Sequence, residues 1–328
     1  MKKAQYYKLN SSNKVLCQLC PHYCTIPEDK SGICRTRINQ SGTLYSENYG
    51  KVASIAIDPI EKKPLYHFKP GSKILSIGSY GCNMRCSFCQ NYSLSQAKVQ
   101  TRYLEPENII DLMTQFPDNI GIAFTYNEPL MWYEYILNVS KKIKEVNPEY
   151  AVVIVTNGYI NPEPLREILP YIDAMNIDLK TINNQTYQRL CKGKLDTVLQ
   201  TIETSLKHCH VEVTSLIITG ENDSESEIEE LAIYLGKINK NIPLHLSRYF
   251  PNYKMNNPPT PVNILIQAKE IAEKYLNYVY VGNLPEIEAN TYCPKCGELL
   301  IERKYYHTII KHQANVCPVC QKNLPIIL

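Results

Sequence analysis

Short apolar runs alternate with amphipathic stretches through the middle of the chain. The apolar runs are rich in β-branched residues, and they predict strands at residues 74–78, 120–125, 151–156, 174–179, 211–218, 243–247 and 278–281. Between most of them, apolar side chains recur at helical spacing, which predicts helices at residues 106–116, 130–146, 195–208, 225–238 and 262–275. Repeated strand–helix units indicate a parallel sheet, either open or closed into a barrel.

Local signals add detail to this α/β pattern. Residues 43–57 alternate and are β-branched, which predicts a hairpin or an extension strand. Ser224 and Glu227 predict a capping box at the start of one helix. Thr260-Pro261 predicts a cap and a first-turn proline for the last helix.

Polar residues gather where the predicted strands end. These are Thr125-Tyr126-Asn127-Glu128-Pro129, Thr156-Asn157-Gly158, Asp178-Leu179-Lys180, and His245 with Arg248. Surface loops are usually polar too, so any one of these segments has an ordinary explanation. In parallel barrels, however, chemistry gathers at the carboxyl ends of the strands, so we expect the segments to form one site.

Length and charge narrow the class of protein. At 328 residues the chain can form one large α/β domain of about 200–250 residues with one or two small modules. Its 35 basic and 32 acidic residues give a net charge of +3, so no bulk field favours nucleic acid or an anionic membrane. No apolar run approaches the ~18 residues that span a bilayer, and the N-terminus lacks a signal-peptide core. We therefore expect a cytoplasmic protein without a membrane partner.

Thirteen cysteines in a cytoplasmic protein indicate metal ligands rather than disulfides. All but Cys191 and Cys209 fall into three clusters, and those two are interpreted as a packing residue and a spare thiol.

The central cluster has three cysteines, Cys82, Cys86 and Cys89, in a polar loop after the first strand. Free thiols or part of a zinc site are the simpler alternatives. Three thiolates can bind three corners of an iron–sulfur cube, which leaves one iron open. An open iron can chelate a small ligand and pass it an electron.

The two flanking clusters have four cysteines each. Cys17, Cys20, Cys24 and Cys34 suit zinc, with a second, fully ligated iron–sulfur cluster as the alternative. Cys293, Cys296, Cys317 and Cys320 form paired knuckles typical of a zinc ribbon, with a rubredoxin-like iron site as the alternative. We predict an N-terminal metal-binding module at residues 1–50, the barrel at 51–288, and a zinc-ribbon module at 289–328.

The string Gly-Cys-Asn-Met-Arg-Cys-Ser-Phe-Cys-Gln-Asn, residues 81–91, resembles the radical S-adenosylmethionine (SAM) superfamily. It is most similar to the branch of the pyruvate formate-lyase activating enzymes and the AmmeMemoRadiSam radical enzymes. Strings at residues 58–68, 211–218 and 243–251 resemble the AmmeMemoRadiSam group in particular. The resemblance implies a partial parallel (β/α)6-type barrel that binds a [4Fe-4S] cluster and SAM.

The resemblance also implies roles for residues at the strand ends. Glu128 stands where the family holds the amino group of SAM, although within Tyr-Asn-Glu-Pro rather than the usual Gly-Gly-Glu. Thr156 and Asn157 match the family's Thr-Asn-Gly, with Val155 in place of an aspartate. Asp178 and Lys180 match its Asp-Leu-Lys, with Lys180 as the carboxylate contact, and His245 matches a late-strand histidine.

These roles imply reductive cleavage of SAM to a 5′-deoxyadenosyl radical, which abstracts hydrogen from a substrate, with flavodoxin or ferredoxin as electron donor. The substrate is a small molecule or nucleic acid, or else the glycine of a partner enzyme, which would make the protein an activase. A non-enzymatic electron-transfer or nucleic-acid-binding metalloprotein is the third hypothesis. The string at residues 58–68 is either a solvated connector or a loop lining the mouth of the site.

Overall fold

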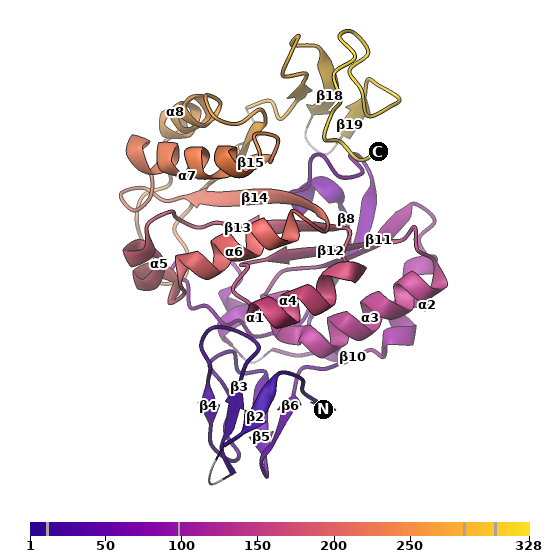
Figure 1. Cartoon of the computed structure of the whole chain (residues 1–328), viewed down its shortest axis with the longest axis vertical. Coiled ribbons are helices and arrows are strands. Elements are labelled where there is room, and N and C mark those ends of the chain that lie inside the picture. Colours follow the sequence, from indigo (N-terminus) through magenta and orange to yellow (C-terminus); the bar gives the residue numbers. More distant parts are fainter. Residues whose placement is uncertain (11–12, 98, 285–286, 305–306) are drawn as a thin grey trace.

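The computed structural model describes residues 1–10, 13–97, 99–284, 287–304 and 307–328. Its centre is an eight-stranded sheet in the order β16-β15-β14-β13-β12-β11-β9-β8 (Figure 1). The strands are β8 (Ser54–Pro59), β9 (Lys73–Gly78), β11 (Asn119–Phe124), β12 (Ala151–Thr156), β13 (Ala174–Asp178), β14 (His210–Ile217), β15 (Leu244–Arg248) and β16 (Val279–Gly282).

The sheet is a partial barrel, as predicted. Strand β9 and strands β11 to β16 pair in parallel, and β8 adds an antiparallel strand beside β9. In the described part of the chain, β8 and β16 form the two edges, so the barrel is open. Every predicted apolar run forms a strand with its ends shifted by at most one residue. The apolar runs predict these strands well because parallel strands are buried on both faces and are therefore almost continuously apolar.

Helices connect the strands and cover the outside of the sheet (Figure 1). They are α1 (Tyr92–Gln96), α2 (Pro106–Thr114), α3 (Tyr133–Val146), α4 (Pro162–Ile168), α5 (Asn184–Cys191), α6 (Leu195–Ser205), α7 (Glu225–Ile238) and α8 (Val262–Ala272), with 3-10 turns at Ile60–Lys62, Pro129–Trp132 and Leu169–Tyr171. All five predicted helices are confirmed, and the short α1, α4 and α5 were not predicted.

The two predicted caps have different outcomes. Ser224 accepts a hydrogen bond from the Glu227 amide over 3.3 Å, but the Glu227 carboxylate accepts from Thr181 instead of completing the box. The prediction for Thr260 is wrong. Its hydroxyl donates to the Ile217 carbonyl over 2.5 Å and accepts from the Tyr249 amide, while Pro261 occupies the cap position of α8.

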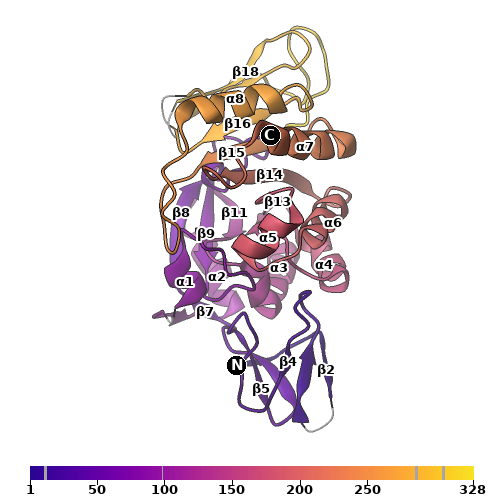
Figure 2. The ribbon, with the colours of Figure 1, turned by 90° about the vertical axis from the view of Figure 1, so that its left-hand side faces the viewer.

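Small antiparallel sheets lie at opposite ends of the molecule, as Figure 2 also shows. At the N-terminal end, one sheet contains β1 (Lys2–Lys3), β6 (Thr43–Ser46) and β5 (Arg37–Gln40), and another contains β2 (Tyr7–Leu9), β3 (Val15–Cys17) and β4 (Thr25–Ile26). A ribbon of β7 (Lys51–Val52) and β10 (Arg102–Tyr103) lies beside the barrel. The C-terminal sheet contains β17 (Thr291–Tyr292), β18 (Leu299–Lys304) and β19 (His307–Ile310).

The string at residues 58–68 closes the amino ends of the barrel strands. Asp58 pairs with Ile74 near the start of β9, and Glu61, Lys63, His67 and Phe68 are buried. The solvated-connector interpretation is therefore wrong.

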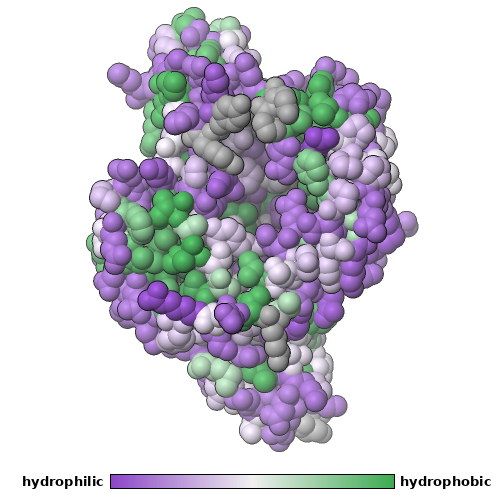
Figure 3. Space-filling view, turned by 180° about the vertical axis from the view of Figure 1, so that it is seen from behind, coloured by the Kyte–Doolittle hydropathy of each residue, from purple (hydrophilic) through white to green (hydrophobic). Residues whose placement is uncertain are grey.

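Behind the molecule, the surface is mostly hydrophilic, with hydrophobic side chains gathered to one side and a hollow near the middle (Figure 3).

Candidate active site

A pocket of about 230 Å³, measured as the space open to the centre of a water molecule, lies at the carboxyl ends of the barrel strands. Cys82, Cys86 and Cys89 line one part of it. The other predicted residues that line it are Glu128, Thr156, Asn157, Asp178 and Lys180. Tyr126, Asn127, Thr214 and Ser247 also line it. The structure thus brings the three cysteines together with five of the six other predicted site residues.

Backbone contacts fix the cysteine loop on its neighbours. The amide of Arg85 donates to the Cys191 carbonyl over 2.9 Å, and that of Ser87 donates to the Leu190 carbonyl over 3.0 Å. The end of α5 therefore anchors the loop. The sequence gives no signal for this contact, because nothing in the spacing of Cys191 relates it to Cys86.

Two donors face the sulfur of Cys82. The Met84 amide lies 3.3 Å from it and the Asn157 side-chain amide 3.6 Å. Burial raises the pKa of the Cys82 thiol well above its ordinary value, and the nearby Glu128 carboxylate adds to the rise. The thiolate therefore needs an electrophilic partner such as a metal, and the two donors would then lie against a charged sulfur.

Glu128 is buried and links two of the strand ends. One carboxylate oxygen accepts from the Thr156 hydroxyl over 2.7 Å and from the Leu130 amide, and the other accepts from the Asn157 amide over 2.8 Å. Burial raises the pKa of Glu128 to about 7, although these hydrogen bonds oppose the rise. Two carboxylate oxygens have about four acceptor positions, so one remains for a further donor.

Asp178 and Lys180 form an ion pair at the end of β13. The ammonium lies 2.9 Å from the Asp178 carboxylate, and its side chain is 14% exposed. Burial opposes the charge on Lys180, but the combined attraction of Asp178 and of the nearby Cys86, Cys191 and Tyr187 side chains outweighs it, so the lysine pKa lies well above its ordinary value. Lys180 therefore offers a permanent cation to the pocket.

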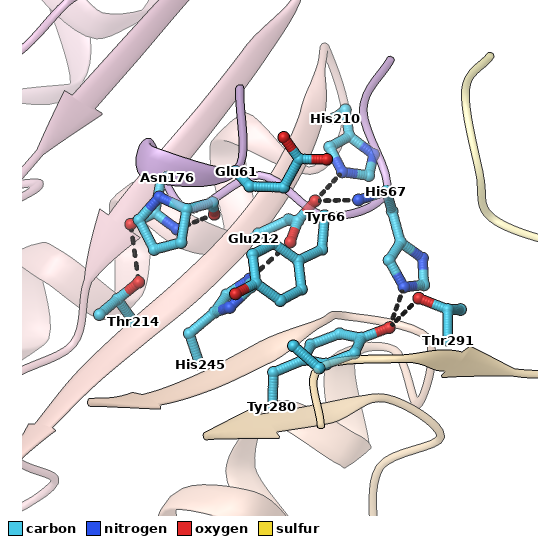
Figure 4. A network of polar contacts seen from close by, with 12 residues as sticks. Glu61, Tyr66, His67, Asn176, His210, Glu212, Thr214, His245, Tyr280 and Thr291 are labelled. Carbon is cyan, nitrogen blue, oxygen red and sulfur yellow. Dashed lines mark hydrogen bonds and ion pairs between the residues drawn. The ribbon is translucent and has the colours of Figure 1, made fainter. Parts of the chain in front are cut away.

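His245 lies outside this pocket, in a buried network at the amino ends of the strands (Figure 4). It is the second residue of β15, whereas Ser247 of the same strand reaches the pocket. Its ring contacts the Glu212 carboxylate over 2.6 Å, and Glu212 also contacts the His210 ring over 3.0 Å and accepts from the His67 amide. Burial would raise the pKa of Glu212, but the two histidines hold it well below its ordinary value.

The same network reaches the C-terminal sheet. The Tyr280 hydroxyl contacts the His67 ring over 2.6 Å and the Thr291 hydroxyl over 2.8 Å (Figure 4). Arg303, which is buried, donates to Thr291 over 2.7 Å and to the Tyr66 carbonyl over 2.5 Å. Burial lowers the pKa of His67 to about 3, so its ring is neutral near pH 7. The network therefore joins the barrel to the C-terminal sheet.

Tyr126 belongs to one of the strand-end segments predicted to form the site, and it lines the pocket, but no individual role was predicted for it. Its φ of 75° is rare for an aromatic residue. Its hydroxyl donates to Asp58 over 2.8 Å, and the buried Lys63 ammonium lies 2.7 Å from the same carboxylate. Burial would raise the pKa of Asp58, but its hydrogen bonds and the Lys63 charge lower it to about 2. This buried ion pair holds the strained tyrosine in place.

The four C-terminal cysteines converge on one point. Their sulfurs all lie within 4.8 Å of one another, with Cys293 3.5 Å from Cys320 and Cys296 3.6 Å from Cys317. Four sulfurs on a tetrahedral zinc, with bonds of about 2.3 Å, would be about 3.8 Å apart. The group therefore has the dimensions of a single-ion site.

Comparison with known proteins agrees with the geometry of the pocket. A family model described as the radical SAM superfamily matches residues 76–235. The chain is 41% identical to the uncharacterized protein MJ0808 of Methanocaldococcus jannaschii, over the whole of both chains. The chain belongs to the radical SAM superfamily.

More distant relatives include the pyruvate formate-lyase-activating enzyme of Clostridium pasteurianum, 28% identical over 46% of this chain and 65% of the relative. The crystal structure of a radical SAM methyltransferase from Sphaerobacter thermophilus has the same fold. It covers 71% of each chain with a TM-score of 0.52 and 16% identity.

Membership makes this protein a radical SAM enzyme, and the superfamily typically uses a [4Fe-4S] cluster, SAM and an electron donor. The predicted fold class and superfamily are confirmed. Within the described residues, none of the helices has the length and apolar character to cross a membrane.

Proposed function

We propose that Cys82, Cys86 and Cys89 hold a [4Fe-4S] cluster that cleaves SAM, and that this protein acts as a catalyst on a substrate of its own. The observation that supports it best is the pocket shared by these thiols and the polar ends of β11, β12 and β13. Together, the bound cofactors supply a 5′-deoxyadenosyl radical, by one-electron cleavage of SAM to methionine, and this radical abstracts hydrogen from the substrate.

The donor set fits this pair of cofactors. Three thiols can bind three irons of a cube and leave the fourth for the amino and carboxylate groups of SAM. Lys180 offers ammonium donors to the SAM carboxylate, and Asp178 keeps that ammonium charged and oriented. Glu128 has an acceptor position for the SAM amino group, while Thr156 and Asn157 fix its carboxylate. We leave His245 out of this proposed set because its ring is engaged by Glu212.

The outer modules and partners complete the proposal. We propose zinc for the tight C-terminal group, and we keep residues 1–50, 51–288 and 289–328 as the three units. A low-potential carrier such as flavodoxin or ferredoxin would supply the electron. The Tyr126 wall, held by Asp58 and Lys63, would face the substrate side of the pocket.

A second candidate function is an activase that forms a glycyl radical on a partner enzyme. The names of several relatives favour it, including a 4-hydroxyphenylacetate decarboxylase activating enzyme of Clostridium scatologenes, 30% identical over 36% of this chain and 38% of the relative. Incubation with a candidate partner and detection of a glycyl-radical doublet by electron paramagnetic resonance (EPR) would favour this function.

The main test is formation of 5′-deoxyadenosine under anaerobic conditions with a strong reductant. We expect product from the reconstituted wild-type protein and none above background from Cys86→Ala, because one iron loses its ligand. Cys209→Ala is the matched control and should keep wild-type yield, since Cys209 lies outside the pocket. Wild-type protein with an intact cluster and no product would contradict the proposal.

Cys191→Ala separates a three-cysteine site from a four-cysteine one. Cys191 is buried and its thiol contacts that of Cys86, so it is a possible fourth ligand. The open site predicts that this variant keeps its iron, whereas loss of iron would argue for a closed, relay-type cluster.

A further inference from the structure

We propose that Cys17, Cys20, Cys24 and Cys34 bind a second, fully ligated [4Fe-4S] cluster rather than zinc, in direct contact with the loop of Cys82. This inference is independent of the proposed reaction, because it concerns cysteines outside the pocket.

The sulfurs of the N-terminal cysteines are spaced more widely than those of the C-terminal cysteines. Among the described residues, the C-terminal cysteines are the one group of three or more possible ligands whose ligand atoms all lie within 4.8 Å of one another. The four N-terminal cysteines are described, buried or half-buried, and yet they do not converge to that extent. A zinc ion would draw its thiolates to about 3.8 Å from one another, whereas a cube binds each thiolate at a different iron corner.

The N-terminal cysteines surround a space instead. All four line one small cavity of about 10 Å³, measured as the space open to the centre of a water molecule, together with apolar side chains such as Leu19 and Ile26. Four sulfurs in van der Waals contact around a single ion would leave no such space between them. Apart from its cysteines, His22 and Arg37, the cavity is lined by apolar residues, so its lining offers few partners for a stable water cluster.

Neighbouring charges suit a buried anionic metal site. Arg37 lines the cavity and is 1% exposed. Its guanidinium pairs with Glu134, but its Nε atom has no hydrogen-bond partner among the described residues. His22 also lines the cavity, and its Nε2 atom contacts the Asn83 carbonyl over 2.7 Å. Four cysteines are enough for one cube, so the proposal needs no ligand from His22.

This second site contacts the loop of the first. Gly81, which precedes Cys82, has a φ of 89°, and a Cβ atom there would lie 2.6 Å from the Cys34 carbonyl oxygen. The Thr36 hydroxyl lies 3.3 Å from the Cys34 sulfur. With the contact of His22 to Asn83, the two cysteine loops touch at both ends of Gly81–Asn83. Two clusters held here would therefore lie close enough to interact magnetically.

The test uses the triple variant Cys82→Ala/Cys86→Ala/Cys89→Ala, which leaves the N-terminal cysteines untouched. After anaerobic reconstitution of the full chain, we expect about eight iron atoms per wild-type chain and about four in the variant, with matching sulfide, because each cube contributes four. The expected zinc content is about one atom in both proteins. A variant with no iron and about two zinc atoms would overturn the proposal.

Two outcomes distinguish this proposal from the proposed function. If the triple variant keeps its iron but the wild-type protein fails to cleave SAM, only the catalytic proposal fails. Cys20→Ala/Cys24→Ala is the reciprocal variant and should lose about half of the iron while it still binds SAM. EPR provides an independent readout: the reduced wild-type protein should show broadening from spin coupling that is absent from both variants, and a simple sum of the two variants' spectra would contradict the contact between the clusters.

Discussion

The two four-cysteine groups of this protein have the same number and type of ligands but different surroundings. The sulfurs of the C-terminal cysteines lie within 4.8 Å of one another. Cys293 and Cys317 belong to a small hydrophobic cluster with Leu300, Ile301 and Leu324. The N-terminal cysteines surround a cavity, and Cys17, Cys20 and Cys34 belong to the main core that includes the barrel.

The two groups differ in where they lie relative to the pocket, which fits the proposed roles of a structural metal site and of a site near the chemistry. The C-terminal sheet joins the amino ends of the barrel strands through Arg303 and Thr291, away from the pocket. Cys34 and His22 of the N-terminal module contact the loop of Cys82 at the pocket end. Ligand count alone does not distinguish them, because both have four cysteines.

The largest effect is expected from a matched pair, Cys24→Ser and Cys296→Ser, which breaks one site at a time. We expect the first variant to lose about four iron atoms and keep its zinc, and the second to lose about one zinc atom and keep its iron. Elemental analysis with sulfide determination measures both. If both variants lose zinc alone, the two groups are alike and the comparison fails.

Lys180→Met tests whether the pocket at the carboxyl ends of the strands binds SAM. Loss of a charge-assisted hydrogen bond of about 1.5–3 kcal/mol predicts SAM affinity weaker by about 10- to 150-fold. Calorimetric titration of reconstituted protein with SAM measures it, with iron content as a check on the cluster. Lys254→Met is the control, since its side chain lies over Tyr253 and is not part of the pocket lining. Equal affinity in Lys180→Met and wild type would exclude the proposed contact.

The smallest expected effect is on the pH dependence of the free energy of unfolding, and it comes from His67. This residue is buried at the amino ends of the strands, and its pKa is about 3. Between pH 6.5 and 3 the unfolded chain binds a proton at this position and the folded chain does not. His67 therefore contributes stability fully above pH 6.5, and that contribution falls by about 1.4 kcal/mol for each pH unit below it.

Denaturant unfolding of His67→Gln and wild type between pH 7.5 and 5.5 measures this dependence. The amide of glutamine can still contact Tyr280 but does not titrate, so the variant should have a flatter pH dependence than wild type. Parallel curves for the two proteins would contradict a buried neutral His67.

Much of the fold followed from the sequence because the barrel strands are buried on both faces. The site followed in part, since Glu128, Asn157 and Lys180 stand at or just beyond strand ends. His245 was expected in the site but lies outside the pocket, because it is near the start of β15 rather than its end. The contacts of Glu212 and the strained Tyr126 depend on strand register and backbone angles, which residue patterns do not encode.

The most direct test of the central claim is EPR spectroscopy of the reduced, reconstituted protein with and without SAM. An open iron in the pocket predicts that SAM changes the [4Fe-4S] signal of the wild-type protein, because its amino and carboxylate groups bind that iron. The triple variant Cys82→Ala/Cys86→Ala/Cys89→Ala keeps only the proposed N-terminal iron site. Its signal should not change when SAM is added. An unchanged wild-type spectrum at saturating SAM would contradict the account.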